Sequence, residues 1–260
     1  MVMKTKLSVN LNKVALIRNS RDTIIPSIVD AATTAISAGA SGITVHPRPD
    51  MRHIRPDDVY DLAALLSKEE YRHIEFNIEG NPYAGAETNG YPGFMKLVQD
   101  VNPHQATLVP DDPSQLTSDH GWDLISESNQ LRPLVADLQR SDIRVSLFMD
   151  PDEKQLELAA RLGVDRIEFY TGPYADHYGT PTQSEILESF TTAGKIAHSL
   201  GLGINAGHDL NQDNLDTFCR SISQVAEVSI GHAIISDSLW LGLEKTVARY
   251  DKILKDVESN

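Results

Sequence analysis

Short apolar runs alternate with longer amphipathic segments along the whole chain. Each run is rich in aliphatic and β-branched residues and ends at a polar residue or a glycine. Such runs, bounded by turn residues, are typical of buried strands. We therefore predict eight strands, over residues 7–10, 42–46, 74–79, 105–110, 143–148, 166–170, 202–206 and 225–231.

The segments between these runs have apolar positions at helical spacing. Pro56 with Asp57 and Asp58 starts one of them, and Gly163 follows the end of another, as is common at helix termini. The pattern predicts helices over 24–38, 56–66, a short segment ending near 101, 131–140, 150–162, 184–200, a segment from about 212, and 236–256.

Eight strand–helix units fill the 260 residues, at about 32 residues each. Strands that alternate with helices pair in parallel through right-handed crossovers. Eight units at this length fit a closed (β/α)₈ TIM barrel, of class α/β, better than an open sheet. Since no shift in composition or linker divides the chain, we expect a single domain over 1–260.

Charge and composition exclude several classes of protein. The 23 basic and 37 acidic side chains give a net charge of −14, which disfavours a nucleic-acid partner or an anionic membrane surface. Cys219 is the single cysteine, so no disulfide forms within the chain. There is no apolar run of the roughly 20 residues that a membrane span needs, and the first residues lack the pattern of a secretory signal. We expect a cytoplasmic protein.

The chemistry of such a barrel lies where the strands end. These positions hold three histidines and two glutamates among other polar residues: Asn10, Asn12, His46, Arg48, Glu79, Thr107, Ser146, Asp150, Glu168, Asn205, His208, Gly231 and His232. Two imidazoles and a carboxylate, from His46, His208 and Glu79, suit proton transfer near neutral pH.

Other interpretations of these residues remain open. Each histidine could be a structural residue, and two histidines with a glutamate can hold zinc. The chain has no HExxH motif or comparable ligand spacing, so we predict no metal. Glu168 could stabilise a cationic intermediate such as an iminium, or it could form a structural ion pair inside the barrel.

Two cationic loops and one glycine-rich end indicate binding of anions. Arg18 and Arg21 follow the first strand, and Arg48, Arg52, His53 and Arg55 follow the second. Guanidinium groups bind phosphate in a bidentate manner, although for Arg52 and Arg55 we favour pairing with surface acids. The segments 205–209 and 229–234 place glycines before helices, which is typical of phosphate sites in this barrel. We infer two phosphorylated substrates or one bisphosphate.

The motifs together resemble the pyridoxine 5′-phosphate synthase family. The matching stretches follow the order of the chain and cover almost all of it, at 9–21, 42–54, 76–79, 108–110, 145–148, 167–175, 205–208 and 230–235. The resemblance implies a TIM barrel with extra helices that assembles as a homo-octamer. It also implies condensation of 3-amino-2-oxopropyl phosphate with 1-deoxy-D-xylulose 5-phosphate into pyridoxine 5′-phosphate, inorganic phosphate and water, with no cofactor.

The same resemblance assigns roles to residues of this sequence. His46 and Glu79 would accept protons, His208 would donate one, and Glu168 would stabilise the transition state. The aminoketone phosphate would be held by Asn10, Arg21, Gly231 and His232. The deoxyxylulose phosphate would be held by Arg48, His53 and Thr117, the last in a long loop that could act as a lid.

Three features depart from the usual pattern of that family. Asn12 and Lys13 stand where many members have aspartate and histidine, and we expect Lys13 to contact the deoxyxylulose phosphate. Asp209 replaces the usual glycine among the substrate-binding residues, and a carboxylate beside a phosphate is unfavourable unless it caps the next helix. The stretch 83–92 is longer than is typical, and we assign it no function.

Two further hypotheses stand beside the synthase. The same barrel could house a phosphosugar aldolase or isomerase, which would need only one substrate. It could also be a non-catalytic phosphate-binding barrel, which would predict loss of His46, Glu79 or His208, yet all three are present.

Overall fold

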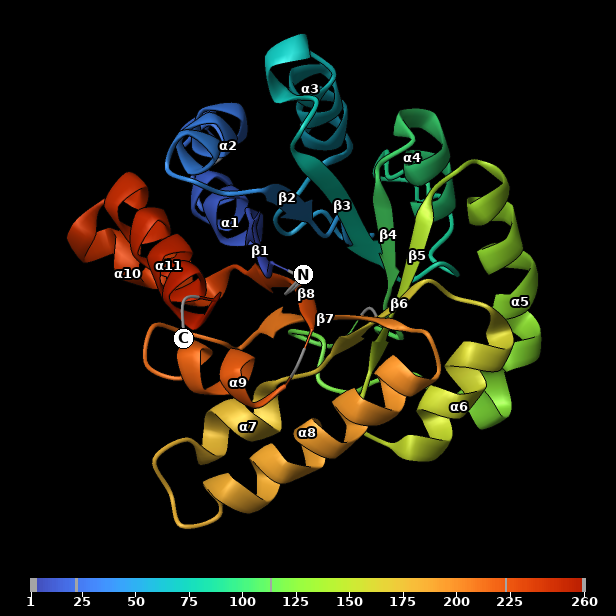
Figure 1. Cartoon of the computed structure of the whole chain (residues 1–260). Helices are drawn as coiled ribbons and strands as arrows, with labels where there is room; N and C mark the ends of the chain where they lie inside the picture. The colour runs from blue at the N-terminus through green and yellow to red at the C-terminus, as the bar shows by residue number, and fades with distance from the viewer. Residues whose placement is uncertain (1–3, 22, 113, 223, 259–260) are drawn as a thin grey trace.

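Eight parallel strands close into a barrel in the order in which they follow one another along the chain. The computed structural model describes residues 4–21, 23–112, 114–222 and 224–258. Figure 1 shows the strands at the centre and the helices around them. The predicted TIM barrel is confirmed, and each strand lies within two residues of its predicted bounds: β1 (Lys6–Asn10), β2 (Gly42–Val45), β3 (Glu75–Gly80), β4 (Gln105–Leu108), β5 (Arg144–Met149), β6 (Arg166–Phe169), β7 (Gly203–His208) and β8 (Val225–Ile230).

Most predicted helices are present, with two corrected boundaries. Ser27 caps α2 by accepting a hydrogen bond from the Asp30 amide, so the helix begins at Ile28 and not at residue 24. Asp123 caps α5, which begins at Leu124, seven residues before the predicted position, and Pro133 is accommodated inside the helix. The helices within predicted segments are α2 (Ile28–Ser37), α3 (Pro56–Leu66), α4 (Phe94–Val101), α5 (Leu124–Arg140), α6 (Glu153–Leu162), α8 (Gln183–Ser199) and α9 (Leu215–Ser221).

The last predicted helix is two helices. They are α10 (His232–Leu241) and α11 (Leu243–Glu258), separated at Gly242, whose φ of +81° favours glycine. The prediction also missed two short helices that directly follow strands, α1 (Asn12–Asn19) and α7 (Gly172–His177), and the 3₁₀ turn η1 (Glu69–Tyr71).

The helix α1 changes the interpretation of Arg18. Its guanidinium is buried and forms a bidentate ion pair with Asp58 of α3, with one contact of 2.9 Å between Nη2 and Oδ2. Arg18 therefore joins two helices instead of belonging to a cationic loop.

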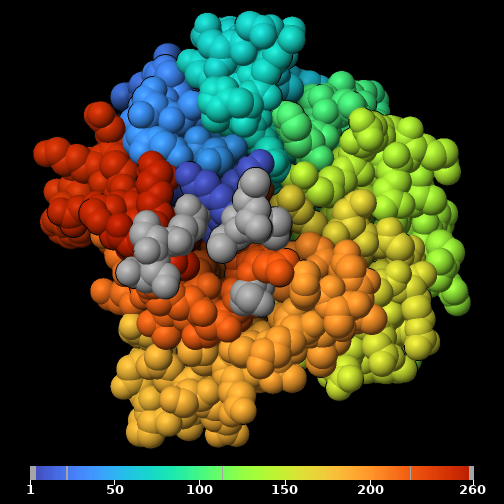
Figure 2. Space-filling view, viewed as in Figure 1, coloured from blue at the N-terminus to red at the C-terminus, as the bar shows by residue number. Residues whose placement is uncertain are grey.

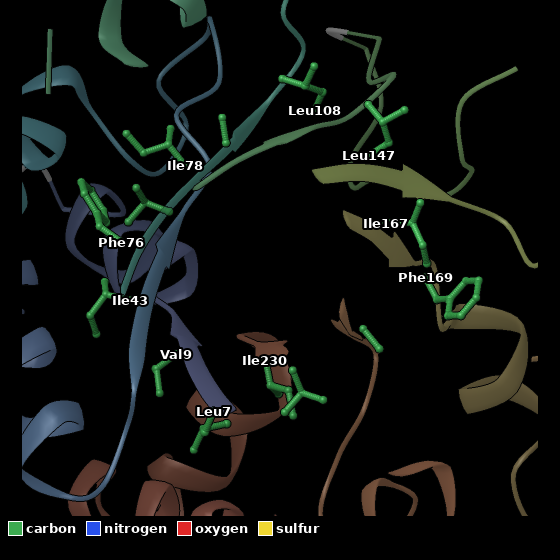
Figure 3. Packing of buried hydrophobic residues seen from close by; sticks show 14 of the residues in the cluster. Leu7, Val9, Ile43, Phe76, Ile78, Leu108, Leu147, Ile167, Phe169 and Ile230 are labelled. Carbon is green, nitrogen blue, oxygen red and sulfur yellow. The ribbon is translucent and has the colours of Figure 1, made fainter. Parts of the chain in front are cut away.

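The two faces of the strands differ in polarity. The outward side chains are aliphatic or aromatic and pack under the helices, as Figure 3 shows for Ile43, Leu108 and Ile167. The inward side chains are polar, and several are bonded across the barrel: the Ser8 and Thr44 hydroxyls lie 2.7 Å apart. The hydrophobic core is therefore a ring between strands and helices, and the barrel interior is a hydrogen-bonded layer that includes Asn77, Gln105, Thr107 and Asn205.

The ends of the chain close the ring of helices. In Figure 2 the colours run around the molecule in chain order, so the red C-terminal helices lie beside the blue N-terminal segment. The helix α11 packs against α2 and α9, and the buried thiol of Cys219 lies in α9. In the described part of the chain, every helix is too short or too polar to traverse a lipid bilayer.

Strands β7 and β8 approach each other closely at the cavity end of the barrel. A Cβ atom built on Gly207 would lie 2.0 Å from the backbone oxygen of Ser229, so only glycine fits there. The pairing of these strands also shifts register between Ile204 and Asn205. The following residue, His208, is delivered into the mouth of the barrel from this point.

Candidate active site

A cavity of about 550 Å³ opens at the carboxyl ends of the strands. Its walls bring together thirteen of the fourteen residues predicted from the sequence: Asn10, Asn12, Lys13, His46, Arg48, His53, Glu79, Thr117, Glu168, His208, Asp209, Gly231 and His232. Arg21 is the exception, because it is exposed beyond the end of α1 and does not line the cavity. Within one chain, Arg21 therefore does not join Asn10, Gly231 and His232, the residues predicted to hold the aminoketone phosphate with it.

The carboxylate of Glu79 is the centre of a polar cluster from adjacent strands. Its Oε2 atom lies 4.0 Å from Nδ1 of His46 and accepts a hydrogen bond of 3.3 Å from the Asn10 amide. Asn12 fixes the position of His46 by accepting a hydrogen bond of 2.9 Å from its backbone amide. The ends of β1, β2 and β3 thus hold an imidazole and a carboxyl group side by side.

Burial shifts the pKa values of these groups in opposite directions. Desolvation, together with the charge of Arg48, lowers the pKa of His46 well below its usual value, so this imidazole is neutral at pH 7. Desolvation raises the pKa of Glu79 to about 8, with further contributions from Glu227 and Asp111. The pair therefore has an unprotonated base beside a carboxyl group that titrates near neutral pH.

Glu168 is a fully buried carboxyl group at the end of β6. Burial raises its pKa well above the usual value, and the neighbouring Glu79 adds to the effect. Its Oε2 atom has no hydrogen-bond partner among the described residues, and the side chain lines the cavity. Among the described residues Glu168 forms no ion pair, and the largely buried Arg166 lies 4.0 Å from Glu227 instead.

His208 has both ring nitrogens engaged. Nε2 lies 2.8 Å from the Thr117 hydroxyl and Nδ1 lies 2.9 Å from Oδ2 of Asp209. Burial opposes its charge, but the hydrogen bond and charge of Asp209, together with Glu79, raise the pKa of His208 above its usual value. Asp209 does not cap the next helix, since α9 begins after Asn214.

The amino end of α10 faces the cavity at the end of β8. Gly231 precedes this ten-residue helix, and a Cβ atom there would lie 3.0 Å from Cβ of Asn10. His232 begins the helix, and its first turn carries no acidic residue. Backbone amides at such a helix start favour an anion.

A cationic wall lies on the other side of the cavity. Arg48 forms an ion pair with Asp111 and donates a hydrogen bond of 3.1 Å to the Gln115 carbonyl. Burial lowers the pKa of His53 to about 3, and its Nδ1 accepts a hydrogen bond of 2.9 Å from the Ile54 amide. The proton of this neutral ring is therefore on Nε2, where it can donate to a ligand.

The sequence matches one family over almost its whole length. Residues 7–256 match the family described as "Pyridoxal phosphate biosynthesis protein PdxJ". This chain belongs to the PdxJ family. The resemblance found in the sequence is thereby confirmed.

Close relatives of this PdxJ chain share about half of its residues. The pyridoxine 5′-phosphate synthase of Xylella fastidiosa (strain 9a5c) is 51% identical over 257 residues, covering 99% of this chain and 97% of the relative. The pyridoxine 5′-phosphate synthase of Xanthomonas campestris pv. campestris (strain B100) is 52% identical over 254 residues, covering 97% of each.

Solved structures of other proteins share the barrel of this PdxJ chain. A tryptophan synthase chain from M. tuberculosis has a TM-score of 0.63 at 10% identity, over 96% of this chain and 93% of that one. A 4-hydroxy-2-oxoglutarate aldolase from TTHB1 has a TM-score of 0.60 at 10% identity, over 96% of this chain and 95% of that one. At this identity the likeness concerns the fold alone.

Sequence reasoning missed one buried acid in the site of this PdxJ chain. Asp111 pairs with Arg48, accepts a hydrogen bond of 3.0 Å from Ser118, and lies 3.5 Å from Nε2 of His46. The proline-flanked pair Asp111–Asp112 has the pattern of a surface turn, so only the fold reveals its partners. Arg52 was expected on the surface, yet it also lines the cavity while pairing with Asp50. The described residues contain no cluster of His, Cys, Asp and Glu suited to a metal ion.

Proposed function

We propose that this chain is a pyridoxine 5′-phosphate synthase. It condenses 3-amino-2-oxopropyl phosphate with 1-deoxy-D-xylulose 5-phosphate and releases pyridoxine 5′-phosphate, inorganic phosphate and water. The observation that carries the proposal is one cavity in which an imidazole with a lowered pKa, an imidazole with a raised pKa and two buried carboxyl groups lie between the amino end of α10 and the cationic wall. A reaction that joins two phosphorylated substrates through several proton transfers needs this combination.

The aminoketone phosphate binds at the start of α10. The backbone at Gly231 and the side chains of Asn10 and His232 surround this position. Because Asn10 also bonds to Glu79, a phosphate held here brings the amine end of the substrate toward the acid–base cluster. Arg21 was predicted to share this role; within the single chain it lies outside the cavity.

The deoxyxylulose phosphate binds at the cationic wall. Arg48 and Lys13 supply positive charge, and His53 supplies an N–H donor from Nε2. Thr117 reaches this region from the loop that follows β4. Lys13 stands where many members of the family have a titratable ring, and its side chain lines the cavity beside Arg48.

The proton transfers are divided among the groups by the directions of their pKa shifts. His46, whose pKa is lowered, accepts a proton, whereas His208, whose pKa is raised, donates one. Glu79, with its pKa near 8, can do both in turn, which suits successive dehydration and ring closure. Glu168 is neutral while the cavity has no cation, and its ionised form stabilises an iminium that forms beside it.

No redox or group-transfer cofactor is needed for this reaction, because ring closure and loss of phosphate and water involve no net oxidation. The contribution of the protein is to hold two reactive phosphates together and to supply protons in place.

The test uses purified protein and both substrates. We expect pyridoxine 5′-phosphate, followed by its absorbance and fluorescence, to appear with one phosphate released per product. Omission of either substrate abolishes the product, and Glu79→Gln lowers kcat by about 100-fold or more. Turnover of a single phosphosugar without the aminoketone would instead support an aldolase or isomerase and overturn the proposal.

We also propose that the enzyme works in the cytoplasm as a homo-octamer. Support for self-association comes from large exposed apolar side chains: on α10 Leu239 and Trp240 are 70% and 87% exposed, and between α1 and α2 Ile24 and Ile25 are 84% and 67% exposed. Light scattering of the purified protein tests this, and a monomer at micromolar concentration would contradict it.

A further inference from the structure

The backbone around His208 is held in an uncommon conformation. His208 has a φ of +33°, which is rare for residues other than glycine. Thr171, which precedes α7, contacts the residues on both sides of His208. Its hydroxyl donates to the Gly207 carbonyl and accepts a hydrogen bond of 3.3 Å from the Asp209 backbone amide. This arrangement turns the Asp209 side chain back toward the preceding imidazole.

The contacts of the imidazole define its orientation. With the Asp209 carboxylate 2.9 Å from Nδ1, the hydrogen of the neutral ring resides on Nδ1. Nε2 is then the atom that faces Thr117, on the loop over the cavity, at 2.8 Å. An imidazole with one nitrogen held by a carboxylate and the other directed at the substrate space is arranged for proton transfer at the second nitrogen.

We infer that Asp209 is a positioning residue for proton donation by His208, and not a substrate ligand. The inference rests on the proposed function for the identity of the reaction, and on the contacts above for the role of the carboxylate. Asp209 occupies the place where the family usually has glycine, so this chain has added a charged partner to its proton donor.

Several charges act on His208 from the surrounding elements. Asp209 is on its own loop, Glu79 is on β3, and Asp111 follows β4; these acids favour the protonated ring. Lys13 on α1 opposes it, whereas His46 after β2 is neutral and adds no charge. Removal of Asp209 takes away the hydrogen bond and the nearest negative charge and leaves the buried ring facing Lys13, so the imidazole loses its proton at a lower pH.

The direct test is a titration of His208 by NMR in protein with labelled histidine, with His208→Asn to assign the signal. In Asp209→Asn we expect the pKa of His208 to fall by about one unit or more. The matched control is Asp213→Asn, which removes the same charge from an exposed site four residues further along the loop. An unchanged titration in Asp209→Asn would overturn the inference, whether or not the protein makes pyridoxine 5′-phosphate.

Kinetics distinguish a positioning role from substrate binding. We expect Asp209→Asn to lower kcat by about tenfold and move its basic limb to lower pH, with KM for both substrates changed less than threefold. Asp209→Glu, which retains the charge, should recover part of kcat. A rise in KM at constant kcat would overturn the inference. Asp209→Gly, which has the usual family residue and adds no clash, gives a second folded variant for both measurements.

Discussion

The charge of Lys13 acts on two imidazoles of the cavity at once. It lowers the pKa of both His53 and His208, and its ammonium group has no hydrogen bond or ion pair with any residue that the structure describes. A cation held in a cavity without a protein partner is available for a ligand anion.

We therefore predict that Lys13→Ala raises KM for deoxyxylulose phosphate about tenfold, as expected for loss of one charge-assisted contact, and leaves KM for the aminoketone phosphate nearly unchanged. Steady-state kinetics with one substrate varied at a time measure both. Lys68→Ala, at an exposed lysine beyond α3, is the control. A larger effect on the aminoketone phosphate would place Lys13 at the other anion site.

At the residue scale, the sequence predicts the members of the site better than their partners. His46, Glu79 and His208 stand at the ends of apolar runs, so the barrel geometry alone gathers them. The pairing of Arg48 with Asp111 links residues 63 positions apart, and no local pattern encodes it. Asp209 is adjacent to His208 in sequence, yet its contact depends on a positive φ that sequence does not display.

At the scale of elements, β7 and β8 depend on one glycine. We predict that Gly207→Ala lowers the free energy of unfolding by about 3 kcal/mol, because the added methyl group overlaps the Ser229 carbonyl and the strands must separate. Urea denaturation measures this. Gly85→Ala is the control, since a Cβ atom at Gly85 has nothing within 4 Å, and we expect it to change stability by less than about 0.5 kcal/mol. Equal effects of the two substitutions would contradict the prediction.

Three of the contacts that hold the loop after β4 lie over the cavity. Arg48 and Arg52 donate to the Gln115 carbonyl at 3.1 and 3.0 Å, and Thr117 contacts His208. We predict that Thr117→Val, which keeps the shape but removes the hydroxyl, raises KM for deoxyxylulose phosphate several-fold, while Thr117→Ser does not.

Ser114 gives a control in the same loop. Its hydroxyl donates only to the Asp112 carboxylate on the surface, so Ser114→Ala should leave KM unchanged. If Ser114→Ala and Thr117→Val change KM for deoxyxylulose phosphate equally, the contact between Thr117 and His208 has no part in binding this substrate.

The elements with a long buried face could be predicted from the sequence, and the short ones could not. All eight strands carry apolar side chains on the helix-facing side, so their positions follow from the sequence. The helices α1 and α7 have only eight and six residues and begin directly after strands, so their periodicity is too brief to detect. The break at Gly242 interrupts an otherwise continuous amphipathic pattern, which made two helices resemble one.

At the scale of the whole molecule, buried carboxyl groups link stability to pH. Burial raises the pKa of Glu227 to about 7 and that of Glu79 to about 8, and it raises that of Glu168 well above its usual value. In the unfolded chain these groups ionise near pH 4.5, so the folded state binds more protons and loses stability as the pH rises through the folded pKa values. The folded pKa values of His46 and His53 are lowered, so these two groups make the folded state more stable as the pH rises, but only below pH 6.5.

We predict that the free energy of unfolding falls between pH 6.5 and 8. In Glu227→Gln, which cannot ionise, the fall should be smaller by about 1 kcal/mol. Urea denaturation at both pH values, at one protein concentration, measures the difference. Parallel pH profiles for Glu227→Gln and the parent chain would show that Glu227 is ionised in the folded state at both values.

The rate at which Cys219 reacts with a thiol reagent can report local opening of the fold. The Cys219 sulfhydryl is shielded in α9, and burial raises its pKa to about 12, so a thiol reagent cannot modify it in the closed fold. With no second cysteine in the sequence to confuse the signal, the speed of labelling reports how often the β7–α9–β8 unit opens to solvent. Slower labelling of Cys219 with both phosphorylated substrates bound would show that a filled cavity makes the β7–α9–β8 unit open less often.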